Sequence, residues 1–303
     1  MTRRFKYYRW ILFAAVMVAV GWFIYRNVGE IRSYRFNYNI WLIVGAFFVE
    51  ILAYLAQFVI WIDLSRKYDL KAPSIDAGRG FFVSQLGKYV PGKVGLVLVR
   101  MESYRGYSKR KIAVATGLEM ILTIAAACIV VLFGIMSAGE LFPSYVIYGS
   151  VVILGLILVL IYPPIFLKII NRFFKIIKRE PIQDSPSYFI TLKYVLGFIL
   201  VALLHGMGFY LVLNSLSPVS FSYFLTITAV YYSAGIIGLI TIFAPAGIGV
   251  REGILMLILP LIISEPVVIV GALLIRLLMT ASELTLAGTF SLLDRLHKNT
   301  TEL

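Results

Sequence analysis

The stretch from Ser74 to Tyr104 reads SIDAGRGFFVSQLGKYVPGKVGLVLVRMESY, and its centre decides how the chain folds. Pro91, Gly92 and Gly95 interrupt a segment that is otherwise apolar enough to be a membrane helix. Proline removes a helical hydrogen bond and clashes with the preceding turn, so the segment divides into two pieces, each too short to cross a bilayer alone. The sequence therefore predicts a helical hairpin that enters the membrane and turns.

A second segment, about residues 222–263, has the same construction. Its centre, IFAPAGIGVREG at 242–253, carries breaks at Pro245, Gly247 and Gly249. We predict a second re-entrant hairpin here.

The rest of the chain is built of long apolar runs. Of its 303 residues 60% are hydrophobic and 14% charged, whereas an ordinary soluble domain has about 25% charged residues. A run of about 20 apolar residues spans the hydrocarbon core as a helix. Six runs fit this length: 10–25, 40–62, 112–136, 145–167, 188–214 and 266–290. We therefore expect an all-α polytopic membrane protein, folded as a single membrane domain over residues 1–303, with six full spans and two hairpins.

The net charge of +13 comes from Lys and Arg concentrated in loops. Basic loops of a membrane protein face the cytoplasm, so this pattern indicates orientation rather than nucleic-acid binding. We expect both termini on the cytoplasmic side of the plasma membrane. The cytoplasmic basic residues would be Arg3, Arg4, Lys6, Arg9, Arg66, Lys67, Lys71, Arg79, Arg105, Lys109, Arg110, Lys111, Lys168, Arg172, Lys175, Lys178, Arg179, Arg295 and Lys298. Arg26, Arg32 and Arg35 are the exception, since they fall in a loop predicted to lie outside.

This orientation makes the first hairpin open from the cytoplasm and the second from outside, which is an inverted repeat. The first unit would be 40–136 and the second, upside down, 188–290. Interrupted segments at equivalent places in two halves are typical of a transporter's binding site. The alternative is eight plain helices, two of them kinked at proline.

Backbone that leaves a helix at membrane depth must be buried in protein or line a watery cavity. The hairpin breaks therefore predict a cavity, and helix N-termini facing it would favour an anion such as phosphate. Lys88, Lys93 and Arg251 flank the breaks and could bind the same anion. The alternative for Lys88 and Lys93 is that they extend to the cytoplasmic interface.

Several charged residues fall within apolar runs, where each is costly. They include Glu50, Glu119, Arg276 and Glu283; we expect Arg276 to meet Glu119 or Glu50 across the bundle. The alternative to a cavity role is purely structural ion pairing. His205 lacks neighbouring ligands and is expected to serve as a hydrogen-bonded packing residue, with a proton relay as the alternative. The candidate substrate-binding set is Lys88, Lys93, Arg100, Glu119, Arg251, Glu252, Arg276 and Glu283. We find no catalytic motif, metal site or cofactor site, so we do not expect an enzyme.

Residues 84–95 (SQLGKYVPGKVG), Glu119 downstream, and residues 245–253 (PAGIGVREG) together resemble the lysylphosphatidylglycerol synthase transmembrane family. The likeness covers nearly the whole chain. In that family, the membrane portion of the multiple peptide resistance factor moves aminoacylated phosphatidylglycerol between leaflets.

The resemblance implies a lipid flippase whose partners are membrane lipids. The substrate would be an aminoacyl phospholipid, a polyprenyl-phosphate-linked sugar or another anionic lipid. Nothing follows residue 303, so we expect a stand-alone member without the soluble aminoacyl-transferase domain, and a homo-oligomer is possible. The alternatives are a small-molecule or ion transporter, and a membrane glycolipid transferase or its accessory subunit.

Overall fold

The computed structural model describes residues 28–89, 95–104, 106–138, 144–161, 188–241 and 249–301, with a few isolated residues between these ranges. No strand occurs among these residues, and the protein is an all-α polytopic membrane protein. Its long helices are α3 (Ile40–Arg66), α6 (Lys109–Ser137), α7 (Ser144–Ile161), α9 (Tyr188–Leu216), α10 (Phe224–Ile240) and α12 (Glu265–Thr301). Its shorter helices are α2 (Val28–Ser33), α4 (Ser74–Gln85), α5 (Gly95–Ser103) and α11 (Val250–Ile258), with 3₁₀ turns η1 (Leu86–Tyr89), η3 (Phe221–Tyr223) and η5 (Leu259–Leu261).

Four of the predicted spans are found as helices long and apolar enough to cross a membrane: 40–66, 109–137, 189–216 and 265–297. The predicted span 145–167 is covered by α7 up to Ile161, and the predicted span 10–25 lies almost entirely outside the described residues. A fifth candidate, Phe221–Leu239, belongs to the second hairpin. One arm of that hairpin is thus long enough to cross the bilayer, and its re-entrant insertion stays a prediction.

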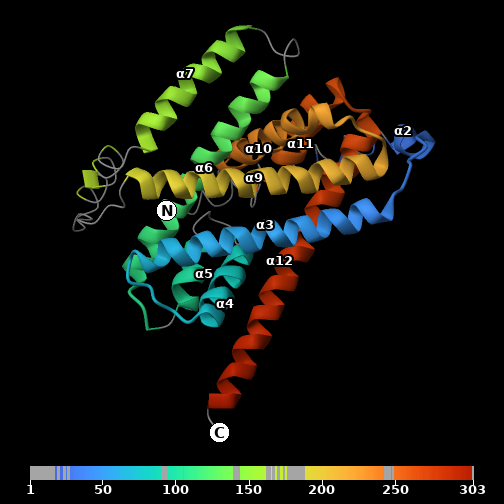
Figure 1. Ribbon diagram of the computed structural model, residues 1–303. Coiled ribbons are helices and arrows are strands. Elements are labelled where there is room, and N and C mark those ends of the chain that lie inside the picture. The colour runs from blue at the N-terminus through green and yellow to red at the C-terminus, as the bar shows by residue number, and fades with distance from the viewer. Residues whose placement is uncertain are drawn as a thin grey trace.

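Helices α3 and α9 lie side by side through the middle of the molecule and run in opposite directions (Figure 1). The backbone N–H groups of Asn37 and Asn39, just before α3, donate to the carbonyls of Leu216 and Ser215 at the end of α9, both at 2.9 Å. These bonds tie the beginning of one helix to the end of the other.

The remaining helices exchange partners across this central pair. Helix α6 packs against α10, and α12 packs against α4. In each predicted unit the last helix, α6 or α12, thus packs against the hairpin of the other unit. The division into units 40–136 and 188–290 as inverted repeats stays a prediction.

Both interrupted segments reverse direction as hairpins. A Cβ on Gly87 would lie 2.7 Å from the carbonyl oxygen of Gly95. In a continuous helix those residues would be separated by about 12 Å along the axis, since each residue rises 1.5 Å. A Cβ on Gly238 would likewise lie 3.3 Å from the Cα of Gly247. The chain therefore turns back at both places, and the alternative of two kinked helices is excluded.

The first hairpin packs on an aromatic core. Phe58 and Trp61 from α3 meet Phe81 and Phe82 from α4, and Phe290 from α12 closes the cluster. Ring centroids of neighbouring pairs are 4.9–6.2 Å apart, in the range of favourable aromatic contacts. This cluster fixes α4 and the far half of α12 against α3.

Candidate functional site

A cavity of about 100 Å³ lies where the two hairpins approach each other. Its polar lining is Lys88, Arg251, Glu252 and Arg276, and apolar side chains of α11 and α12 complete it. Lys88 comes from η1 of the first hairpin, whereas Arg251 and Glu252 open α11 of the second. The lining has three cations and one acid, so its field favours an anion.

Lys88 is directed toward α12 within the bundle. Its ammonium donates to Oε1 of Glu283, a buried carboxylate on α12, and the Tyr54 hydroxyl donates to the same oxygen. The side chain of Lys88 is 30% exposed, so it is held between Glu283 and the cavity. This is the inward placement that a ligand contact requires.

The second hairpin lines the cavity with the first residues of α11, and the beginning of this helix is capped. Gly249 has a φ of 84°, which favours glycine, and its N–H donates to Oε2 of Glu252 at 2.7 Å. The other oxygen of Glu252 pairs with the guanidinium of Arg276 on α12. Glu252 therefore fastens the turn of the hairpin to α12. The expectation that Arg276 meets Glu119 or Glu50 was wrong, because α11 places Glu252 nearer.

Arg251 is the cation of the cavity without a carboxylate. Its guanidinium carbon lies 4.0 Å from the centroid of the Tyr231 ring on α10, a cation–π contact. No carboxylate within the described ranges lies within 4.0 Å of its nitrogens, unlike Lys88 and Arg276. Arg251 is therefore the lining residue whose charge is best able to serve a ligand.

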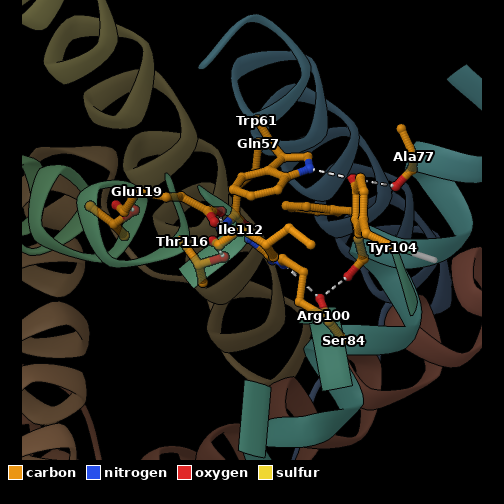
Figure 2. Close-up of polar contacts among 11 residues, drawn as sticks. Gln57, Trp61, Ala77, Ser84, Arg100, Tyr104, Ile112, Thr116 and Glu119 are labelled. Carbon is orange, nitrogen blue, oxygen red and sulfur yellow. Dashed lines mark hydrogen bonds and ion pairs between the residues drawn. The ribbon is translucent and has the colours of Figure 1, made fainter. Parts of the chain in front are cut away.

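Two predicted site residues lie outside the cavity, in a separate buried cluster (Figure 2). Arg100 on α5 pairs with Glu119 on α6, and its Nε donates to Ser84 Oγ at 2.9 Å. The guanidinium carbon also lies 4.2 Å from the centroid of the Trp61 ring. Gln57 donates to the remaining oxygen of Glu119 at 3.2 Å. These bonds hold α5 against α3 and α6, which is the structural role named as the alternative.

Glu50, the buried acid of α3, also has a partner within the bundle. Glu50 is fully buried, and its Oε2 lies 2.6 Å from Nδ1 of His205 on α9. The imidazole packs edge-on against the Tyr54 ring, with centroids 5.1 Å apart. His205 is thus hydrogen-bonded, as expected, but its pairing with Glu50 was not foreseen because the two residues are 155 positions apart.

The structure brings together four of the eight predicted ligand residues as lining of one cavity, with Glu283 bound to one of them. Lys93, Pro91, Gly92 and Pro245 lie outside the described residues. The sequence reasoning gave Tyr231 no role, since an aromatic residue in an apolar helix carries no signal until the rotation of the helix is known.

Fold and site together define a polytopic helical membrane protein with a charged cavity between two hairpins. Residues 9–287 match the family described as lysylphosphatidylglycerol synthase TM region. The chain belongs to this family, and it is accordingly a multi-pass membrane protein of a lipid-related class. No curated protein matches the chain.

Proposed function

We propose that the protein is a flippase that moves an anionic lipid, or a lipid carrying a phosphate headgroup, between leaflets through the cavity. The observation that carries the proposal is the cavity lining, in which Lys88 of one hairpin and Arg251 of the other face the same space with an excess of positive charge. Membership of the lysylphosphatidylglycerol synthase TM region family supports a lipid as cargo.

The size of the cavity agrees with a headgroup. At about 100 Å³ it is well below the roughly 300–1,000 Å³ of pockets for drug-sized ligands. A phosphate group fits this space, while acyl chains would remain in lipid during passage. Arg251 would bind the phosphate with charge-assisted hydrogen bonds, and Lys88, still paired with Glu283, would add to the positive field of the lining.

Rocking of one half against the other would move the site between leaflets, as in transporters built from inverted repeats. Such motion needs contacts that connect the halves and can separate. The Lys88–Glu283 pair is one, because it joins η1 of the first predicted unit to α12 of the second.

We propose a plasma-membrane location with both termini in the cytoplasm. The end of α3 and the beginning of α6 carry Arg66, Lys67, Lys109 and Lys111, and the Asp69–Lys111 ion pair at 2.8 Å places these two ends together. This basic end of the molecule would face the cytoplasm by the positive-inside rule.

Leaflet-resolved transport tests the proposal. Fluorescent phosphatidylglycerol with an NBD-labelled acyl chain is placed in both leaflets of phosphatidylcholine proteoliposomes, and dithionite quenches the label in the outer leaflet. In protein-containing vesicles the protected inner half should become quenched over time. Arg251→Gln should slow this exchange about tenfold or more, because a charge-assisted hydrogen bond contributes about 1.5–3 kcal/mol.

The matched control is Arg295→Gln, at an exposed position of α12 remote from the cavity. It should exchange lipid at the wild-type rate. An absence of lipid exchange by the wild-type protein would reject the flippase proposal, and equal rates for wild type and Arg251→Gln would reject the phosphate contact.

A further inference from the structure

The described interior of the membrane bundle carries equal numbers of formal cations and anions, but two of them are not matched to each other. The acids are Glu50, Glu119, Glu252 and Glu283, and the cations are Lys88, Arg100, Arg251 and Arg276. Three ion pairs combine Arg100 with Glu119, Arg276 with Glu252, and Lys88 with Glu283. Arg251 and Glu50 have no ion-pair partner of fixed charge among these residues. Arg251 stacks on the Tyr231 ring, and Glu50 contacts the imidazole of His205.

Glu50 is enclosed within the bundle, and His205 is its hydrogen-bonding partner. The carboxylate packs directly on Gly208 of α9, where any Cβ would collide with Oε1. Oε1 has no hydrogen-bond partner among the described residues, whereas Oε2 contacts the imidazole at 2.6 Å. A neutral His205 leaves a buried anion, and a protonated His205 gives a matched pair.

The tyrosines Tyr231 and Tyr54 connect the surroundings of Arg251 with those of Glu50. Tyr231, on which Arg251 stacks, is within electrostatic range of both Glu50 and Glu283. Tyr54, one turn after Glu50 on α3, contacts the His205 ring and donates to Glu283. The titratable or charged groups around the His205–Glu50 pair are Tyr54 from α3, Tyr231 and Tyr232 from α10, Arg251 from α11, Glu283 from α12 and, two turns along α3 at Gln57, Glu119 from α6.

From this arrangement we infer that the protein couples anion binding at Arg251 to the uptake of one proton by the His205–Glu50 pair. A bound monoanion uses the charge of Arg251 and leaves the interior with one excess negative charge, that of Glu50. Protonation of His205 restores neutrality. The inference rests on the proposed function, and it names the ion that would drive lipid movement.

The proton is taken up by the imidazole of His205. With Glu50 ionised, the Nδ1–H of His205 donates to Oε2, and Nε2 accepts a proton from water. The imidazolium formed keeps its bond to Glu50, and no other bond changes. Release of the anion removes the field that favours this proton, so it returns to water.

Isothermal titration calorimetry with dihexanoyl phosphatidylglycerol tests the coupling on the detergent-solubilised full chain. Titrations at one pH in buffers of different ionisation enthalpy give the affinity and the number of protons exchanged in the same measurement. We expect the wild type to take up protons on lipid binding between pH 6 and 8.5, approaching one proton per bound lipid toward the alkaline end of that range. In that range the affinity should weaken by up to tenfold per pH unit as pH rises, because each proton taken up contributes one unit of slope.

Two variants should abolish proton uptake and shift affinity in opposite directions. His205→Gln fixes the pair in its anionic state and should hold affinity at the weak, high-pH value of the wild type. Glu50→Gln removes the anion and should bind tightly at every pH between 6 and 8.5. A merely structural role would weaken both variants. His297→Gln, at an exposed position on α12, is the control and should retain proton uptake.

The outcomes separate the two proposals. Binding without proton exchange in the wild type would overturn the coupling and leave the flippase proposal standing. Binding of equal pH dependence in wild type and His205→Gln would do the same. An absence of both lipid binding and lipid exchange would reject the proposed function and the coupling with it.

Discussion

Replacement of Arg100 by methionine tests whether the Arg100–Glu119 cluster is structural. Arg100 is fully buried, pairs with Glu119, donates to Ser84 and stacks on Trp61 and Phe81 at 4.2 and 4.7 Å from their centroids. Methionine is apolar and similar in length, so it preserves much of the packing and removes the charge. Glu119 is then left buried with only the Gln57 hydrogen bond.

Breaking a buried ion pair from one side costs about 3–5 kcal/mol, since the remaining charge stays desolvated. We expect Arg100→Met to lower the free energy of unfolding by about that amount. The double variant Arg100→Met/Glu119→Gln removes both charges and should recover at least half of the loss.

Unfolding can be followed in detergent with SDS as denaturant, through the reactivity of Cys128, the single cysteine of the chain, which lies partly buried on α6. A loss below about 1 kcal/mol for Arg100→Met, or no recovery in the double variant, would contradict the account of a desolvated Glu119.

Two further substitutions test the hairpin and the end of α12. Gly87→Ala should destabilise the first hairpin, because its Cβ would lie 2.7 Å from the Gly95 carbonyl oxygen. A lower melting temperature is expected. Gly117→Ala is the control, because its Cβ would meet nothing within 4 Å. Arg79→Gln should release the end of α12, because it removes the 3.2 Å ion pair to the buried carboxylate of Asp294. Faster tryptic cleavage after Arg295 is expected, and unchanged cleavage would show that the pair does not anchor the helix.

The hairpins were predictable from sequence because their signal is local. Pro91 and the glycines around it disfavour a continuous helix, and the Gly87–Gly95 approach shows that the chain turns back there. The length of the arm before the second break was less clear, because the apolar run from Phe221 to Leu239 alone suffices to cross a bilayer.

The partners of the buried charges were not predictable. Spacing along one helix shows which residues share a face, but it does not show which neighbour that face meets. Arg276 pairs with Glu252 on the hairpin next to it, and Glu50 pairs with His205 on α9. Both outcomes depend on the rotation of each helix about its axis, which packing fixes.

Helix α12 has 37 residues and runs on well past the other helices (Figure 1). From Arg276 at the cavity to Asp294 at the Arg79 anchor is about 27 Å at 1.5 Å per residue, so a tilt of about 10° at the cavity displaces the far end by roughly 5 Å. If the proposed function holds, a small tilt of α12 at the cavity would therefore become a larger displacement at its other end. A spin label or fluorophore on Leu296, which is exposed near the end of the helix, would detect that displacement.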